Sequence, residues 1–237
     1  MPEHIVSSYD ADLQGLRQRI AEMGGIAEKM LVDASISLVR HDKSLARTVI
    51  AADSRLDVLQ REVEENAVLT IARRQPLAID LRETISAIRI SGDVERIGDL
   101  AKNIAKRALA IGEDFKPQKI VVGLRHMIDL VLGQLKDVLD AYAQKDTAKA
   151  LDVWKRDGAI DALYTSLFRE LLTYMMEDPR NISFCTHLLF CAKNIERIGD
   201  HTTNIAETVH YLVTGENLAI DRPKNDRSID TTVEPGA

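Results

Sequence analysis

The residues best suited to chemistry in this chain are carboxylates, and they occur in pairs spaced four apart. Glu95 and Asp99 are the first and last residues of the segment Glu-Arg-Ile-Gly-Asp, and the same five residues occur again at Glu196–Asp200. Residues four apart on a helix lie on one face, about one turn from each other. Like charges at this spacing destabilise a helix by about 0.2–0.5 kcal/mol per pair, and a multivalent cation between them would relieve the repulsion. The pairs therefore predict metal binding.

Two further acidic pairs have the same spacing. Asp53 and Asp57 in the first half of the chain correspond to Asp157 and Asp161 in the second. If the helix that carries each pair lies beside the helix with the repeated string, each half gathers four carboxylates. The predicted metal ligands are Asp53, Asp57, Glu95, Asp99, Asp157, Asp161, Glu196 and Asp200. Ligation by oxygen alone favours hard divalent or trivalent ions, here Mg, Mn or Fe, and suits zinc less well without His or Cys.

Acidic residues on a helix can also be simply solvated. Arg96, Arg197 and Lys102 could then form surface ion pairs of little energetic value. A solvated face tolerates substitution, however, and would not be expected to keep five residues letter for letter in two copies. The exact repeat favours metal ligation.

Helices must position these residues, since the apolar spacing of three and four residues runs through almost the whole chain. It predicts helices over about 13–38, 44–73, 76–111, 118–143, 146–177 and 179–214, with Pro76 and Pro179 in the first turns of the third and sixth. Gly98 and Gly199 lie inside two of these helices, where glycine costs about 1 kcal/mol relative to alanine. Close approach of a neighbouring helix would explain both.

The repeat defines the architecture. We expect an all-α fold of two tandem antiparallel three-helix bundles, residues 8–112 and 117–214, related by the internal repeat and packed together. Residues 215–237 are polar and lack apolar periodicity, so they are predicted to form a disordered tail.

Composition excludes several classes of protein. The net charge of −6 leaves no basic footprint for nucleic acid. No secretory signal precedes the first helix, and no uncharged run is long enough to span a bilayer. Cys185 and Cys191 suit neither a CxxC nor a zinc motif and are predicted to be buried thiols in a reducing compartment, with the cytoplasm as the expected location.

The two copies of Glu-Arg-Ile-Gly-Asp, each followed by Asn-Ile-Ala, resemble the motifs of the PhoU family of phosphate-specific transport accessory proteins. Similar segments are Tyr9-Asp10, Met23-Gly24-Gly25 and Arg74-Gln75-Pro76-Leu77-Ala78, so the resemblance covers about residues 5 to 214. It implies two three-helix bundles with multinuclear metal clusters on acidic helix faces. It also implies a homodimer that represses phosphate uptake and the phosphate-starvation response, acting between the ATPase subunit of the phosphate ABC transporter and a sensor histidine kinase. Contact with the membrane would be peripheral, through these partners.

Two other functions are open on the residues alone. One is a metal-dependent phosphate-ester hydrolase, in which paired ions activate water. The other is an iron-handling helical bundle, although the Glu-x-x-His pairs of di-iron bundles do not occur at these positions. No Ser/His/Asp set, P-loop or positioned His base is visible, so the prediction is a non-enzymatic regulator with no catalytic residues.

Overall fold

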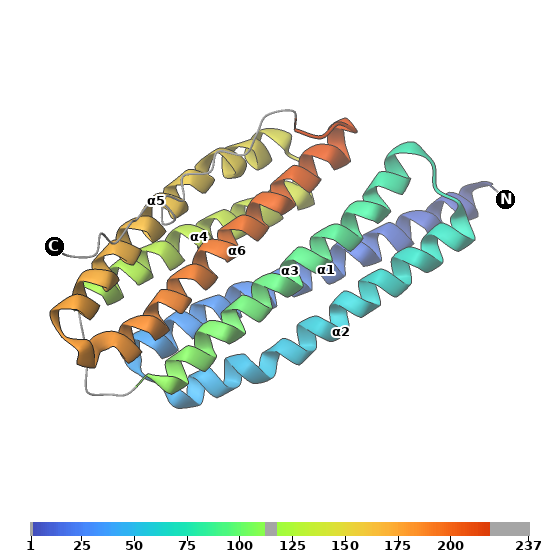
Figure 1. Ribbon diagram of the computed structural model, residues 1–237. Coiled ribbons are helices and arrows are strands. Elements are labelled where there is room, and N and C mark those ends of the chain that lie inside the picture. Colours follow the sequence, from blue (N-terminus) through green and yellow to red (C-terminus); the bar gives the residue numbers. More distant parts are fainter. Residues whose placement is uncertain (1, 112–117, 219–237) are drawn as a thin grey trace.

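The computed structural model describes residues 2–111 and 118–218, and six long α-helices account for most of them (Figure 1). Their bounds are α1 Pro2–Arg40, α2 Lys43–Arg74, α3 Ala78–Ala110, α4 Gln118–Gln144, α5 Thr147–Glu177 and α6 Ile182–Thr214, with a short 3-10 turn η1 at Pro179–Asn181. Of the predicted disordered tail, residues 219–237 lie outside the described residues, as do both predicted edges of the junction between the halves, 112 and 117.

The turn between the first and second helices is built in the same way in both halves. His41 and Lys145 adopt positive φ angles of 55° and 54°, which reverse the chain after α1 and α4. The aspartate that follows each one caps the next helix: Asp42 accepts from the backbone N–H of Leu45, and Asp146 accepts from two backbone N–H groups. Such caps satisfy amides that have no partner within the helix.

The link between the second and third helices differs from the prediction. Pro76 lies in the three-residue link after α2, and α3 begins only at Ala78, because Gln75 turns left-handed (φ 51°) and Leu77 is extended. In the second half, Pro179 does open a helical turn, the 3-10 turn that leads directly into α6. The first helix also begins earlier than its apolar pattern, at Pro2.

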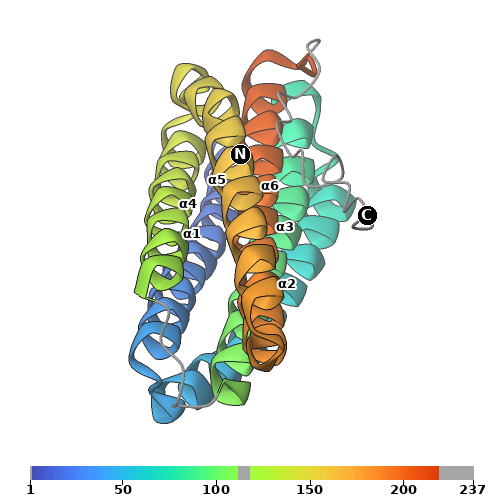
Figure 2. The ribbon, with the colours of Figure 1, turned by 60° about the vertical axis from the view of Figure 1, so that its left-hand side comes forward.

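The predicted all-α fold of two antiparallel three-helix bundles is confirmed. Helices α1, α2 and α3 pack on one another, as do α4, α5 and α6, and the halves meet chiefly through α3 with α6 and less extensively through α1 with α4. Figures 1 and 2 show the halves side by side and running in opposite directions, so the α2–α3 link lies at one end of the molecule and the α5–α6 link at the other. These contacts confirm the prediction that the two halves pack together.

A single cluster of buried apolar side chains includes residues of all six helices, so the core is continuous across the two halves. Cys185 and Cys191 are buried free thiols, as predicted. Among the helices of the described residues, none combines the length and hydropathy that a membrane span requires.

Candidate metal centre

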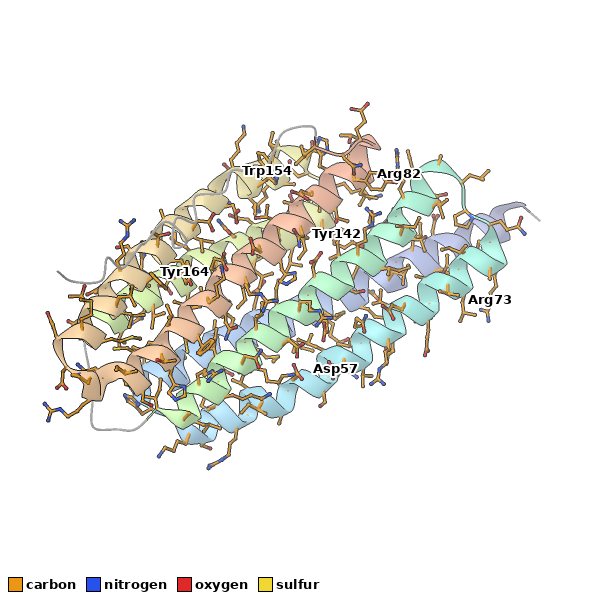
Figure 3. The ribbon with its side chains drawn as sticks, in the orientation of Figure 1. Asp57, Arg73, Arg82, Tyr142, Trp154 and Tyr164 are labelled. Atoms are coloured by element: carbon orange, nitrogen blue, oxygen red, sulfur yellow. The ribbon has the colours of Figure 1, made fainter. Side chains whose placement is uncertain are left out.

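The first acidic cluster lies where α2 and α3 run side by side. Asp53 is buried, whereas Asp57, marked about halfway along α2 in Figure 3, is only partly buried. Glu95 on α3 is close enough to Asp53, Asp57 and Asp99 for their charges to act on it. The structure thus brings together the four carboxylates predicted for this half.

A lysine occupies the space between the two helices in this cluster. Lys102 Nζ donates to Asp53 Oδ2 on α2 and to Asp99 Oδ1 on α3, at 2.5 Å each. Burial alone would lower the pKa of Lys102, but its hydrogen bonds to Asp53 and Asp99 outweigh burial and raise the pKa to about 12. Lys102 is therefore a permanent positive charge that links the two helices.

The remaining charges of the first cluster lie nearer to solvent. Arg96 Nε lies 3.6 Å from Glu95 Oε2, and Arg96 Nη1 lies 3.7 Å from Asp99 Oδ2, with most of the arginine exposed. Burial and then the neighbouring Asp99 carboxylate raise the pKa of Glu95. The interpretation of Arg96 as an ion-pair partner agrees with these distances.

The second acidic cluster lies between α5 and α6 and is more deeply buried. Asp157, Asp161 and Glu196 are only 2%, 4% and 6% exposed, whereas Asp53 alone is buried in the first cluster. The charges of Asp161 and Asp200 both act on Glu196, and Asp157 reaches α6 through the hydroxyl of Thr203.

Glu196 has one satisfied and one unsatisfied oxygen. Lys193 Nζ donates to Oε1 at 2.9 Å, whereas Oε2 is buried without any hydrogen-bond partner. Burial raises the pKa of Glu196, and Lys193 only partly opposes this effect. A buried acceptor without a partner costs about 1–3 kcal/mol, and more when it is charged. A bound ligand or a proton on Glu196 Oε2 would remove this cost.

The residue that takes the place of Lys102 in the second cluster is neutral. Thr203 follows Lys102 in the repeat by 101 residues, and its hydroxyl lies 3.1 Å from both Asp157 Oδ1 and the backbone oxygen of Gly199. The two clusters therefore share their carboxylates but differ at the position between the helices.

The glycines of the repeated string allow the helices to approach. A Cβ atom on Gly98 would overlap Leu56 of α2, and one on Gly199 would lie 3.0 Å from Ile160 Cδ1 of α5. Close approach of a neighbouring helix, predicted from the sequence, is confirmed at both positions. It brings the carboxylates of paired helices within reach of one another.

The two clusters fit a hard cation differently. The unpartnered Oε2 of Glu196 suits one, whereas Lys102 Nζ already lies between Asp53 and Asp99. In the part of the chain that the structure describes, no group of three or more His, Cys, Asp or Glu side chains is placed to hold a metal ion as it stands. Ligation would require the side chains to turn toward one another, and the eight predicted ligands stay a prediction.

Three surface cavities among the described residues are lined by α1 together with α4 or α2. A cavity of about 440 Å³ lies between α1 and α4 beside Arg17 and Tyr142, a second of about 230 Å³ lies farther along the same pair of helices, and a third of about 210 Å³ lies between α1 and α2. None of these three is lined by a predicted metal ligand.

Polar contacts that the sequence did not reveal join the two halves. Asp93 of α3 lies 2.8 Å from His201 Nδ1 and accepts from Asn204 Nδ2 at 3.3 Å, both on α6. Asn204 thus packs against the other half. His201 adjoins the second cluster but faces Asp93.

A second polar contact between the halves centres on Glu83, which is 3% exposed. Arg17 Nε donates to Glu83 Oε1, and Lys145 Nζ of the second half donates to Oε2 at 2.8 Å. Burial raises the pKa of Glu83, but the hydrogen bonds from Arg17 and Lys145 outweigh it, so the pKa is lowered overall. This contact could not be predicted from the sequence, because its partners are distant along the chain.

Trp154, labelled on α5 in Figure 3, is buried. Its Nε1 donates to Glu207 Oε1 of α6 at 3.0 Å. The single tryptophan therefore joins α5 to α6.

Comparison with known proteins places the chain in a family. The family model described as "PhoU domain" matches residues 20–108 and 124–209, one match in each half. A phosphate-specific transport system accessory protein PhoU homolog from Rhizobium meliloti is 56% identical over 94% of both chains. A homolog of the same name from Caulobacter vibrioides is 52% identical over 95% of this chain and 98% of its own.

Solved structures of PhoU proteins share the fold of this chain. The crystal structure of PhoU from Pseudomonas aeruginosa matches with a TM-score of 0.85 and 40% identity, over 88% of this chain and all of that one. The phosphate transport system regulatory protein PhoU from Streptococcus pneumoniae matches with a TM-score of 0.83 and 30% identity, over 90% of this chain and all of that one. The chain belongs to the PhoU family, as its motifs suggested.

Proposed function

From membership of the PhoU family, we propose that this protein is a negative regulator of phosphate uptake and of the phosphate-starvation response. The observation that carries the proposal is the relative that is 56% identical over 94% of both chains and is named an accessory protein of phosphate-specific transport. The proposed partners are the ATPase subunit of the phosphate ABC transporter and the sensor histidine kinase, and the proposed location is the cytoplasm. The protein acts by docking, with no chemistry of its own.

The proposal includes metal binding at the acidic helix faces. Mg²⁺, Mn²⁺ or iron suits carboxylate oxygens, and the buried, unpartnered oxygen of Glu196 supports a ligand role for the second cluster. A bound ion would neutralise the repulsion between carboxylates of paired helices and so fasten α5 to α6.

The regulatory role is tested in cells. Deletion of the gene is expected to derepress phosphate-scavenging genes when phosphate is plentiful, measured with a transcriptional reporter. Membrane association of the tagged protein is expected to disappear when the transporter and kinase are absent, because an acidic protein is not attracted to anionic lipid. Full recruitment to bare anionic vesicles in EDTA would contradict docking through partners.

Metal binding is tested by thermal unfolding of the purified protein. An ion at about 100 times its dissociation constant adds roughly 2.7 kcal/mol, so Mn²⁺ should raise the melting temperature and EDTA should lower it without unfolding the bundles. Identical melting curves would count against the metal. Phosphatase activity that disappears with Asp99→Ala would instead support the hydrolase.

The proposed homodimer rests on the family resemblance. Sedimentation equilibrium gives the mass in solution, and a single species of about 26.4 kDa, the mass of one chain, would contradict it.

A further inference from the structure

The largest of the three cavities lies where α1 of the first half runs beside α4 of the second. Its volume of about 440 Å³ falls within the range of roughly 300–1,000 Å³ that is typical of small-molecule sites. Ile20, Ala21 and Leu139 make part of its wall apolar, and polar side chains line the rest. An apolar wall with a few polar groups is the usual composition of a site for a small organic molecule.

The two adjacent glycines of α1, Gly24 and Gly25, shape this cavity. A Cβ atom on Gly24 would lie 2.6 Å from Leu139 Cδ1, so glycine at this position allows the close contact between α1 and α4. Gly25 lines the cavity, and a Cβ atom there would meet no neighbouring atom of the described residues within 4 Å. Gly24 therefore brings the two helices together, and Gly25 leaves space beside their contact.

Hydrogen-bond donors gather at one end of the cavity. Tyr142, labelled in Figure 3, is 6% exposed, and its hydroxyl is buried with no hydrogen-bond partner among the described residues. Arg17 also lines the cavity, and Arg17 and Lys145 both donate to Glu83, whereas Asp10 acts on Arg17 only as a minor influence. A buried donor without a partner is costly. This end would therefore be stabilised by a further acceptor, and best by an anionic one beside the two cations.

The other end of the cavity is acidic. Glu28 lies there with Asp140, and Asp140 accepts from Lys149 Nζ at 3.0 Å. Burial raises the pKa of Glu28, Lys136 opposes this effect, and the Asp140 carboxylate adds to it. The eleven residues from Arg17 to Glu28 span about 16 Å of helix. An anionic group is therefore disfavoured at this end, and the difference in charge would orient an elongated ligand.

From these features we propose that the protein binds a small apolar carboxylate between α1 and α4. The carboxylate lies at the end with Arg17 and Tyr142, and the apolar body lies against Leu139 in the space beside Gly25. The halves meet chiefly through α3 and α6, so a ligand that contacts both α1 and α4 stabilises the less extensive side of their contact. No residue proposed to bind metal lines this cavity, so its failure to bind a carboxylate would leave the proposed regulatory function intact.

The main experiment compares two probes with the same rings and opposite charge. Naphthoate carries a carboxylate, and naphthylmethylammonium carries an amine. Equilibrium dialysis against the full chain is expected to give about one naphthoate per chain, and binding of the ammonium probe is expected to be at least tenfold weaker. Absence of naphthoate binding, or equal affinity for the two probes, would overturn the proposal.

A matched pair of glycine variants locates the probe. Gly25→Leu places a side chain in the cavity and is expected to lower the affinity for naphthoate at least tenfold. Gly133→Leu on α4 is the control, because a Cβ atom there also meets no neighbouring atom of the described residues and Gly133 lines none of the three cavities. Its affinity is expected to be that of the natural protein. Equal affinity in both variants, with helicity checked by circular dichroism, would place the probe elsewhere and overturn the proposal.

Two further measurements test how the ligand is held. Tyr142→Phe removes only the hydroxyl and is expected to weaken naphthoate binding several-fold without changing the affinity for the ammonium probe. Saturating naphthoate is expected to slow amide hydrogen exchange in α1 and α4 and to leave α2 and α5 unchanged. Unchanged naphthoate affinity in Tyr142→Phe would contradict the position of the carboxylate, and exchange that is unchanged in α1 and α4 would contradict binding between them.

Discussion

The two halves of this protein carry the same five-residue string but surround it differently. In the first half, Lys102 bonds to one carboxylate on each helix. In the second half, Thr203 takes that place and Glu196 keeps an unsatisfied oxygen. Repetition of a motif therefore preserves its geometry, here a carboxylate face and a glycine for close helix approach, without preserving its electrostatics. The residue three positions beyond the motif is a lysine in the first half and a threonine in the second.

The largest effect is expected where the internal cation is removed without replacement. Lys102→Met leaves the buried Asp53 and its neighbour Asp99 without their shared partner, and should lower the free energy of unfolding by about 3 kcal/mol in EDTA. The matched change in the second half, Thr203→Val, removes only one neutral donor and should lower it by about 1 kcal/mol. Urea unfolding in EDTA measures both.

Addition of Mn²⁺ separates the charge of Lys102 from its packing. The ion should restore much of the stability of Lys102→Met, because it can supply the missing positive charge. Equal losses in the two variants, or no recovery with Mn²⁺, would show that the halves do not differ as described.

A smaller effect is expected at Glu83, whose counterpart in the second half, 101 residues later, is the apolar Phe184. Glu83→Gln weakens the hydrogen bonds from Arg17 and Lys145 and should lower the free energy of unfolding by about 2 kcal/mol at pH 7. Urea unfolding over a range of pH is the measurement.

The pH dependence of Glu83 has a definite sign. Its pKa in the folded protein lies below the value of about 4.3 in an unfolded chain, so its contribution is complete above that pH and is lost as the pH falls through the folded pKa. The difference between Glu83→Gln and the natural protein should therefore shrink in acid. A difference that stays constant down to pH 2 would show that Glu83 acts through shape alone.

The smallest effect is expected from the two motif glycines. Gly98→Ala forces a methyl group against the fully buried Leu56 and should lower the free energy of unfolding by about 1 kcal/mol after the gain in helix propensity. Gly199→Ala meets Ile160 at 3.0 Å and should lie within about 0.5 kcal/mol of the natural protein, because the gain and the crowding nearly cancel. Thermal unfolding measures both variants. A larger loss of stability for Gly199→Ala would contradict the closer approach of the neighbouring helix at Gly98.

Much of the fold could be predicted from local signals. Asp42 and Asp146 follow the breaks in the apolar pattern and cap the next helices. The offset between repeats correctly gave two bundles. The preference of proline for a first helical turn predicts a helix that begins at Pro76, whereas the left-handed Gln75 before it delays the start of the helix by two residues.

The electrostatics of the site was harder to predict. The repeat identifies the eight carboxylates and both glycines, but from the sequence alone Lys102 is indistinguishable from a surface ion-pairing residue. Its position three residues after Asp99 was visible in the sequence, whereas its reach across to Asp53 depends on how α2 and α3 pack. Likewise Glu83, Arg17 and Lys145 meet only because the halves run in opposite directions.

That opposed arrangement also fixes a length. The α2–α3 link and the α5–α6 link lie at opposite ends of the molecule (Figure 1), and a strongly exposed apolar side chain lies at each end: Leu77 in the first link, at 81%, and Met176 in the last turn of α5, at 78%. A helix of 33 residues such as α3 spans about 50 Å. Two proteins bound at the opposite ends would be separated by roughly that distance, because the continuous core makes the molecule stiff. Each of them would meet an exposed apolar side chain at its own end.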